Sequence, residues 1–453
     1  MTGEADLGPD RPEKRGGVAG LDERPADWRE GSTATVAGPL PVAMPGLVPP
    51  DQPSVAGVAG PRAVRRVAVR ALTLTDFRNY RRAALAVDDR TVVLVGPNGA
   101  GKTNLLEAVS LLSPGRGLRR ATYEEIARAD GAGGWTVSAR LATRDDGAAA
   151  SGVATTMLGV GIDPPAAGGG GGPRRQRRIR IDGEDARAAD DLLDCARILW
   201  LTPAMDGLFT GPAADRRRFL DRSTLAIAPG HGRRATLYEI AVRHRNRLFE
   251  ERHPNTAWLD GLETEIAEHG AEVVRARAAL VARLNEAAAL RDADAVDFPR
   301  ARLALEGDLE RAGTLDGTLA ERFRELLARN RRAEHAAGRT LIGPHRSDLS
   351  VVHVDKEMPA AKASTGEQKA LLLGIVLGHA AIVAAAAGKS PILLLDEVAA
   401  HLDPSRRAAL YRRLDGLDAQ CFMTGTDPEL FAALAGRAQI VRVEAGSLGG
   451  AAA

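Results

Sequence analysis

The stretch 92-VVLVGPNGAGKTNLLEAVSLL-112 contains three local patterns in succession. It starts with a run of valine and leucine typical of a buried strand, continues through a glycine-rich turn, and ends with apolar residues at helical spacing. The turn fits the pattern G-x-x-x-x-G-K-[ST], in which backbone N–H groups and the start of the helix bind phosphate oxygens. The sequence therefore predicts a strand, a phosphate-binding loop and a helix. The alternative is an ordinary glycine-rich turn.

The residue types in this loop indicate what each contributes to a nucleotide site. Gly96 and Gly101 allow the backbone to form turns that are closed to other residues. Lys102 is placed to reach the outer phosphates, and the Thr103 hydroxyl is a natural ligand for the Mg²⁺ ion that accompanies them. The residues of this segment predicted to bind the nucleotide are Gly96, Pro97, Asn98, Gly99, Ala100, Gly101, Lys102, Thr103 and Asn104, and Lys102 is also predicted to be catalytic.

Length and composition limit what the whole chain can be. Its 453 residues exceed one typical domain. Its formal net charge of +2 argues against a globally basic protein, so any electrostatic binding of nucleic acid depends on local clusters. The two cysteines lie far apart without metal-site spacing, which fits a reducing cytoplasm, and the N-terminus lacks the pattern of a secretory signal.

Changes in composition divide the chain into segments. The first residues are rich in Pro, Gly and Ala without periodicity, which predicts disorder, whereas a later charged and alanine-rich region has apolar residues at helical spacing. A polyglycine stretch indicates a flexible surface insertion. The predicted organisation is a disordered leader (1–63), the first part of a strand-containing lobe (64–211, with the insertion at about 163–174), a helical lobe (212–335), the second part of the strand-containing lobe (336–445) and a tail (446–453).

One apolar run, 371-LLLGIVLGHAAIVAAAAG-388, has the length of a membrane span. It is rich in alanine and glycine, contains His379, and is followed at once by a strand pattern. We therefore expect a buried core helix and no membrane association.

The segment 392-ILLLDEVAAHLD-403 offers the acidic partner that a phosphate loop needs for its metal ion. Four consecutive apolar residues predict a central strand of a parallel sheet, and Asp396 follows at the C-terminal edge, where such sheets bind ligands. Asp396 is predicted to hold Mg²⁺ directly or through water, and Glu397 to orient or deprotonate the water that attacks the terminal phosphate. The alternative, a strand ending in solvated carboxylates, is less favoured because the phosphate loop is present.

The segment 364-STGEQKALLLGIVLGHA-380 begins with a capping box. Ser364, followed three residues later by Glu367, starts an apolar helix whose free N–H groups face outward and form an anion receptor. The alternative is that the capping box only starts a helix.

The combination of these motifs resembles a known family. S-T-G-E-Q-K ahead of L-L-L-D-E-V-x-A-H-L-D resembles the ATP-binding-cassette (ABC) ATPases of chromosome maintenance and repair. The phosphate loop together with 77-FRNY-80, 216-RRRFLD-221 and 343-GPHRSDL-349 resembles the RecF family, over about residues 67–435. The resemblance implies an α/β fold: an ABC-type ATPase head with a phosphate loop, a mixed sheet with flanking helices, and an inserted helical lobe.

The resemblance also implies how nucleotide is used. Such heads dimerise around two ATP molecules, and the serine-bearing helix of one subunit closes over the γ-phosphate held by the other. The chain departs from the family pattern in several places: Ser347 stands where an acidic residue is common, no switch histidine is evident near Thr424 and Asp427, and no glutamine marks the metal-contacting loop near 199–206. The residues expected to bind the nucleotide in trans are Ser364, Gly366, Glu367 and Gln368, with Asp403 at the dimer seam.

Proteins of this family bind DNA, have weak DNA-stimulated ATPase activity, and work with RecR and RecO to help RecA load onto coated single strands at gaps. The resemblance therefore implies ATP and Mg²⁺ as cofactors, gapped or junction DNA, RecR, RecO and RecA as partners, an ATP-dependent homodimer, and a cytoplasmic location. Two rival interpretations remain. One is the ATPase subunit of a membrane importer, which the long spacing between phosphate loop and acidic strand disfavours; the other is a DNA-binding scaffold with negligible ATP turnover.

The sequence offers three basic clusters as candidates for the DNA-binding surface and leaves two interpretations open for each. The clusters 174-RRQRRIR-180, 215-DRRRFLDR-222 and 329-RNRRAEHAAGR-339 either contact phosphates without reading bases or form solvated faces. The arginines of the second cluster are also candidates for joining the helical lobe to the head. Aromatic residues are few, so we expect salt-sensitive, sequence-independent binding without dominant base stacking. For Phe77 and Tyr80, core packing is favoured over lining the nucleotide site.

Overall fold

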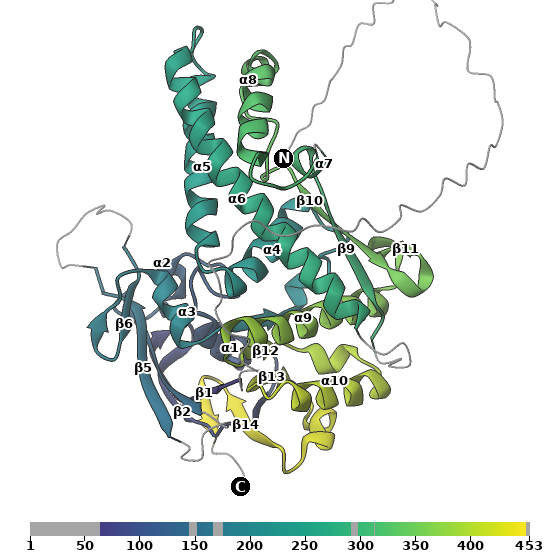
Figure 1. The fold of residues 1–453 in the computed structure, drawn as a ribbon. Coiled ribbons are helices and arrows are strands. Elements are labelled where there is room, and N and C mark those ends of the chain that lie inside the picture. Colours follow the sequence, from purple (N-terminus) through teal and green to yellow (C-terminus); the bar gives the residue numbers. More distant parts are fainter. Residues whose placement is uncertain (1–63, 145–151, 166–174, 291–297, 312, 450–453) are drawn as a thin grey trace, which may run out of the picture. The chain divides into compact units, whose positions relative to one another are not determined.

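The structure, a computed structural model, describes residues 64–144, 152–165, 175–290, 298–311 and 313–449 (Figure 1). The predicted leader, 1–63, and positions 166–174 of the predicted insertion lie outside these residues. Both therefore stay predictions, as do the boundaries proposed between head and lobe.

A six-stranded sheet in the order β15-β14-β3-β13-β12-β8 forms the centre of the head. Its neighbouring strands pair in parallel, except that β15 is antiparallel to β14. All four residues of β12 are buried, because the strand lies between two parallel neighbours and is covered on both faces. This confirms the predicted central strand. The strands are β3 (Thr91–Val95), β8 (Ile198–Leu201), β12 (Ile392–Leu395), β13 (Cys421–Gly425), β14 (Ala438–Glu444) and β15 (Ser447–Gly449), the last within the segment predicted as a tail.

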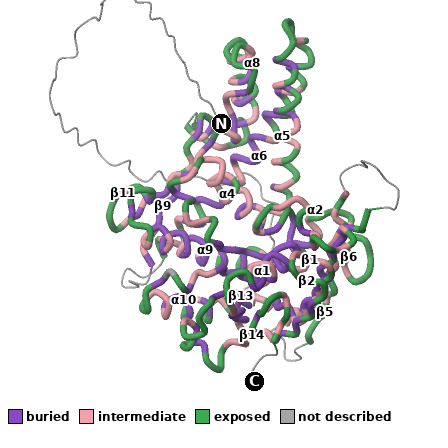
Figure 2. Tube along the Cα trace, turned by 180° about the vertical axis from the view of Figure 1, so that it is seen from behind, coloured by how far each residue is buried: buried purple, intermediate pink, exposed green. Residues whose placement is uncertain are grey.

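Alternate residues of the central strands face two separate hydrophobic cores. Leu393 and Leu395 face a core that includes α9 (Thr365–Ala387), α4 (Ala213–Ile227) and α10 (Pro404–Gly416). Ile392 and Leu394 face the other core, which includes α1 (Lys102–Ser110) and the inner face of a second sheet. Buried residues accordingly concentrate along α9 and around β13 in Figure 2.

The second sheet is antiparallel, in the order β2-β1-β4-β5-β6-β7. Burial alternates along β4, because one face of the sheet packs on the core and the other faces outward. Short helices α2 (Tyr123–Ile126) and α3 (Leu192–Cys195) lie in its connections. The strands are β1 (Arg66–Phe77), β2 (Tyr80–Ala86), β4 (Trp135–Arg144), β5 (Val153–Ile162), β6 (Arg178–Ile181) and β7 (Glu184–Asp185).

A third, antiparallel sheet has the order β11-β10-β9. Its strands are β9 (Ala301–Glu306), β10 (Asp348–His353) and β11 (Met358–Pro359). β9 lies in the segment that the sequence assigned to helices (212–335). Its six residues, ARLALE, alternate too briefly within an alanine-rich region to outweigh helix propensity, and it is pairing with β10 that makes them a strand.

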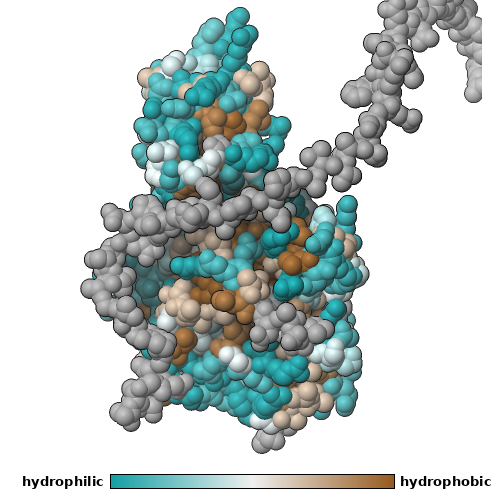
Figure 3. All heavy atoms as spheres, turned by 45° about the vertical axis from the view of Figure 1, so that its right-hand side comes forward, coloured by the Kyte–Doolittle hydropathy of each residue, from teal (hydrophilic) through white to brown (hydrophobic). Residues whose placement is uncertain are grey.

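The predicted amphipathic helices are present as α5 (His231–Leu248), α6 (Thr256–Ala289) and α8 (Leu319–Ala337), with a short α7 (Asp308–Arg311). They stand side by side in Figure 1, and the upper part of Figure 3, where they lie, is largely hydrophilic with a smaller apolar region. Between them the fully buried Arg245 contacts Glu263 at 2.9 Å and Glu334 at 2.5 Å. Losing either carboxylate would leave buried charge uncompensated, so this network fixes how the three helices pack.

Two of the motifs behind the family resemblance meet where α4 joins the helices to the head. Arg216 makes a bidentate pair with Asp348, both contacts at 2.7 Å, and Arg217 donates to the Ser347 carbonyl at 2.9 Å. Asp221 accepts two hydrogen bonds from Arg277 of α6, at 2.7 and 2.8 Å. In the RRRFLD cluster, Arg216 and Arg217 therefore have the structural role that the sequence left as one alternative.

Helix α9 is the one helix among the described residues that is long and apolar enough to cross a membrane. Two thirds of its most apolar window is buried inside the protein, against the central sheet and α4. His379 lies in this buried part and its Nε2 contacts the Ser223 carbonyl at 2.9 Å. The prediction of a buried core helix is confirmed.

Candidate nucleotide site

The glycine-rich loop connects the buried strand β3 to α1, as predicted. Gly101 precedes the helix with φ of 114°, a conformation that favours glycine. Gly96 is needed for a different reason: a Cβ atom there would lie 2.1 Å from the Val443 carbonyl oxygen. Pro97, Asn98 and Gly99 are exposed, so their backbone is accessible to a ligand.

The FRNY element packs directly beneath this loop. Tyr80 is fully buried, and its hydroxyl donates to the Gly101 carbonyl at 3.1 Å. Burial raises the pKa of Tyr80, which keeps the hydroxyl protonated as a donor. The Asn79 amide donates to the Ala100 carbonyl at 3.2 Å and accepts from Asn104 at 2.7 Å. Core packing of Tyr80 is thus confirmed, and its hydroxyl also holds the loop.

A buried carboxylate fixes α1 to the same element. Glu107 is fully buried and accepts from Arg78 at 2.6 and 2.8 Å and from Arg119 at 2.8 Å. Two guanidinium groups compensate the buried charge of Glu107. The arrangement is stabilising only while both guanidinium groups remain in place. Arg119 also contacts Asn104, so the first turn of α1 is tied to the surrounding structure on two sides.

Lys102 is nearly fully buried at the start of α1. Its ammonium group donates to the Gly96 carbonyl at 2.7 Å and to the Pro97 carbonyl at 2.9 Å. The side chain therefore lies along the loop, with its charge beside the backbone that the pattern assigns to phosphates.

The predicted metal-binding residues come together although 293 positions separate them in the sequence. The Thr103 hydroxyl lies 3.0 and 3.1 Å from the two carboxylate oxygens of Asp396. Asp396 is largely buried and also accepts from the Thr424 hydroxyl at 2.7 Å. A hydroxyl next to a carboxylate is a hard-oxygen donor set, which fits Mg²⁺. The described residues contain no cluster of three or more acidic, His or Cys side chains, and a magnesium site shared with phosphates does not require one.

Glu397 follows the acidic residue in a left-handed conformation, with φ of 55°. Such a conformation costs a non-glycine residue on the order of 1 kcal/mol, so the surroundings must hold it. Its N–H donates to the Thr424 hydroxyl at 2.8 Å, which ties it to the group that contacts Asp396. The Glu397 carboxylate makes no hydrogen bond or ion pair within the described part of the chain, so no partner there holds its side chain.

The predicted signature segment begins α9 with a complete capping box. The Ser364 hydroxyl accepts from the Glu367 N–H at 3.4 Å, and the Glu367 carboxylate accepts from the Ser364 N–H at 3.1 Å. A salt bridge from Lys356 at 2.5 Å, followed by the bonds from Ser364, lowers the pKa of Glu367 to about 2. Ser364 is exposed and Glu367 is partly buried, so the helix end borders solvent and its carboxylate is ionised.

The remaining predicted trans residues are placed differently. Gln368 is buried, and its amide donates to the Ala363 carbonyl at 2.8 Å, which anchors the turn before the helix. A Cβ atom on Gly366 would lie 3.9 Å from Arg406, so the start of α9 lies near the start of α10. Asp403 caps α10 by accepting from the Arg406 N–H at 2.9 Å. Among the described residues, no hydrogen bond or ion pair joins this group to residues 96–104.

The basic clusters prove to be mixtures. Arg177 is partly buried and donates to the carbonyls of Leu111, Ser113 and Gly115, and loss of solvent around the guanidinium lowers its pKa. Arg331 contacts Glu263 at 2.5 Å, whereas Arg332 is exposed. Part of each cluster thus stabilises the fold, and the sequence could not separate these arginines from the exposed ones.

The sequence analysis missed the supporting residues of the site. Asn79, Tyr80 and Glu107 hold the loop and α1, and Thr424 links Asp396 to Glu397. The FRNY motif was a signal for the first two, since it was singled out for the resemblance. Nothing in the sequence indicates that Thr424 reaches Asp396, because this depends on β12 and β13 being adjacent.

Comparison with known proteins decides the family. Residues 68–447 match the family model described as the RecF/RecN/SMC N terminal domain. The DNA replication and repair protein RecF of Mesorhizobium japonicum is 53% identical over 384 residues, which cover 83% of this chain and 96% of that protein. The RecF of Brucella suis is 52% identical over 387 residues, covering 85% and 97% of the two chains. The chain belongs to the RecF family.

Solved structures agree at the level of the fold. A recombination mediator protein RecF of the RecFOR pathway, in the form named RecF-ATPrS, has a TM-score of 0.73 at 19% identity, covering 86% of this chain and all of that one. The form named RecF-ATP has a TM-score of 0.72, also at 19% identity, covering 85% and 98%. The predicted fold class, an ABC-type ATPase head of the kind shared by RecF and SMC proteins, is confirmed.

Proposed function

We propose that this member of the RecF family is an ATP-switched, dimeric DNA-binding protein of recombinational repair and replication restart. It acts in the cytoplasm at single-strand gaps, where it helps load RecA together with RecR and RecO. Membership of the family and the likeness in fold to a recombination mediator of the RecFOR pathway support this proposal.

The contact between Thr103 and Asp396 is the observation on which the proposal rests most. It brings the phosphate loop to the end of β12, beside Glu397, as ATP hydrolysis requires. In the proposed site, N–H groups of residues 99–103 donate to phosphate oxygens and the Lys102 ammonium binds the outer phosphates. Mg²⁺, held by Thr103 and Asp396, would neutralise charge on the phosphates. Glu397 would orient the attacking water and accept its proton.

The proposed dimer uses the exposed start of α9. Ser364, Gly366 and the N–H groups of the first turn would face the γ-phosphate bound by a second copy, and Asp403 would lie at the seam. The exposure of Ser364 and Asp403 and the lack of contact with residues 96–104 in the same chain support action in trans. ATP would then join two copies, and hydrolysis would release them.

The test is sedimentation velocity of the Glu397→Gln variant with ATP and Mg²⁺, with and without gapped DNA. Because the amide cannot accept the proton, hydrolysis should stop and the variant should accumulate as an ATP-bound dimer that retains DNA. Glu268→Gln, an exposed residue of α6, is the matched control and should behave as the parent. A Glu397→Gln protein that stays monomeric at saturating ATP would refute the closure mechanism.

Phosphate release separates the switch from a scaffold. The parent should hydrolyse ATP slowly and faster with DNA, whereas Glu397→Gln should show no release above background. If parent and variant release phosphate at the same background rate while both bind DNA, the protein is a scaffold.

A further inference from the structure

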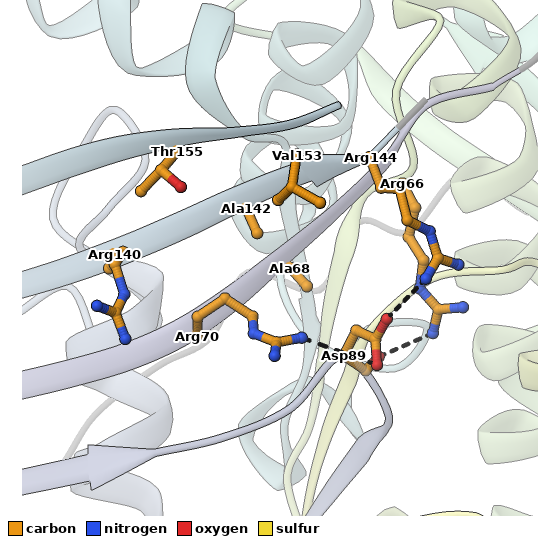
Figure 4. A pocket seen from close by; sticks show the side chains of 9 residues that line it. All are labelled: Arg66, Ala68, Arg70, Asp89, Arg140, Ala142, Arg144, Val153 and Thr155. Atoms are coloured by element: carbon orange, nitrogen blue, oxygen red, sulfur yellow. Dashed lines mark hydrogen bonds and ion pairs between the residues drawn. The ribbon is translucent and has the colours of Figure 1, made fainter. Parts of the chain in front are cut away.

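The outward face of the antiparallel sheet contains a cationic pocket far from the nucleotide site. Its volume is about 400 Å³, and Figure 4 shows Arg66, Arg70, Arg140 and Arg144 around it. Small side chains from β1 and β4 form the floor between these arginines. β1 contributes Arg66, Ala68 and Arg70 to the pocket, and FRNY begins at the other end of this strand, roughly 30 Å from Ala68.

The pocket has more positive charge than its own acids neutralise. Asp89 is its one acidic lining residue, 3.3 Å from Arg144 and 3.9 Å from Arg70. Arg66 pairs with Asp418 outside the lining. Arg140 is exposed and makes no hydrogen bond or ion pair with any other residue that the structure describes. An anionic group would therefore find a free guanidinium here.

Beside the pocket, the first half of β5 has an open edge. β6 pairs with β5 only from Leu158 to Gly161, so within the described ranges no strand pairs with β5 before Met157 on that side. The Met157 N–H donates to the Asp182 carboxylate at 2.7 Å, and the Met157 C=O accepts from the Asp182 N–H at 2.8 Å. Because Asp182 directly follows β6, these backbone groups of Met157 point to the β6 side of β5, away from β4. By the two-residue repeat of an antiparallel strand, the N–H and C=O of Val153 and Thr155 point to the same open side.

Two exposed apolar side chains lie on the pocket face of this strand. Val153 is 58% exposed and pairs with Arg144, and Met157 is 44% exposed and pairs with Arg140. The face thus combines free backbone donors and acceptors, exposed apolar groups and unneutralised arginine.

We propose that this edge binds an extended acidic segment of a partner protein, which adds a strand alongside Val153–Met157. Its backbone would pair with the N–H and C=O groups of Val153 and Thr155. Added strands lie about 4.8 Å from their neighbour, so a carboxylate on the pocket side would extend across the short Thr155 side chain toward Arg140 and Arg144. Apolar residues two positions before and after the carboxylate lie on the same face of the added strand and would cover Val153 and Met157.

The chemistry of the edge favours a polypeptide over the other anionic occupants. DNA phosphates only accept hydrogen bonds, so they would leave the outward carbonyls of Val153 and Thr155 without donors. A second copy of β5 could pair with the edge, but the strand VATTMLGVGI contains no acidic residue to meet the arginines. An acidic extended segment satisfies both requirements.

The test measures fluorescence anisotropy of a labelled Glu–Val peptide titrated with the full chain; in this peptide Val and Glu alternate at every second position, with Thr between them, so that both lie on one face of the strand. Arg140→Glu should weaken binding by about tenfold or more, because it replaces attraction with repulsion. Thr155→Pro should weaken it by about tenfold, because it removes an N–H on the open edge without breaking the pairs with β4. The controls are Arg332→Glu, an exposed arginine of α8, and Thr155→Ala, which keeps the N–H; both should stay within about twofold of the parent.

The results also separate the occupants. Thermal unfolding and ATP binding of each variant should match the parent, since the pocket is remote from the phosphate loop. Equal binding of a Lys–Val peptide, or Glu–Val binding unaffected by both Arg140→Glu and Thr155→Pro, would overturn the proposal. An oligonucleotide whose binding is weakened by Arg140→Glu but not by Thr155→Pro would overturn it in favour of nucleic acid.

Discussion

The phosphate loop and the start of α9 are both predicted to bind the same nucleotide, yet the structure holds them in different ways. Residues from four separate segments surround the loop: FRNY below it, α1 after it, Asp396 beside Thr103, and Thr424 behind Asp396. The start of α9 is held by its own capping box and by Lys356, and its outer side is exposed. The phosphate loop, the enclosed half of the site, is therefore surrounded by residues of its own chain. The start of α9, the presented half, is exposed to solvent.

This difference indicates a division of labour. An enclosed loop keeps its donors fixed before the ligand arrives, which reduces the entropy lost on binding. An exposed helix start has satisfied its local capping bonds and still offers N–H groups and a partial positive charge, so it is suited to an anion presented by a second molecule. Changes in the enclosed half should thus affect nucleotide binding and turnover, and changes in the presented half should affect association.

Lys102→Arg should produce the largest effect. Arginine keeps the charge, but its planar fork does not fit the space between the Gly96 and Pro97 carbonyls, where the ammonium now donates. ATP turnover should fall by about a hundredfold or more, since a misplaced cation stabilises the developing phosphate charge poorly. Phosphate release under saturating ATP measures this.

Lys389→Arg is the matched control, because Lys389 lies outside the site and contacts the Asp194 carbonyl. Its turnover should be unchanged. Full activity of Lys102→Arg would mean that the geometry of the enclosed loop around Lys102 does not matter for ATP turnover.

The buried body of α9 should show in the pH dependence of stability. Burial lowers the pKa of His379 from 6.5 to about 4, outweighing its bond to the Ser223 carbonyl. The unfolded chain then binds the proton more readily, so the stability contribution is complete above pH about 6.5 and is lost as pH falls toward 4, by about 3 kcal/mol in total. Urea unfolding at pH 7 and at pH 4.5 should show this loss, and it should be smaller in His379→Gln, which keeps a donor but does not titrate.

Ser364→Arg should act on association alone. The long cation would occupy the space in front of the helix start, so ATP-dependent dimerisation should weaken by about tenfold or more while ATP affinity stays within about twofold. Sedimentation for the dimer and nucleotide titration for the affinity separate the two effects. Ser447→Arg, in the exposed strand β15, controls for the added charge. Equal loss of ATP affinity and dimerisation would mean that the two halves are not separate.

The sequence predicted the local motifs of the site better than the contacts between distant segments. The loop, the acidic strand end and the capping box were predicted because each is a local pattern of spacing and residue type. That Thr103 meets Asp396 was expected from general architecture, and the contact at 3.0 Å is present. Thr424 and Glu107 were not predicted, because their roles depend on which strands and helices are adjacent. β9 was missed for the same reason, since its strand state comes from pairing with β10.

The smallest expected effect concerns the residues beneath the loop. Tyr80→Phe removes one donor and leaves the Gly101 carbonyl buried without it, which costs about 1 kcal/mol. Tyr411→Phe is a close control, because Tyr411 is also buried and its hydroxyl donates to the Leu430 carbonyl at 2.8 Å, in another part of the head. Both variants should lose similar stability in urea unfolding, but ATP affinity should fall, by about threefold to tenfold, only in Tyr80→Phe. If both lose stability and neither loses affinity, Tyr80 supports the fold without positioning the loop, and enclosure by FRNY is packing alone. If Asn79→Ala, which removes the contact to Ala100, lowers affinity less than additively with Tyr80→Phe, the two side chains hold one shared loop conformation.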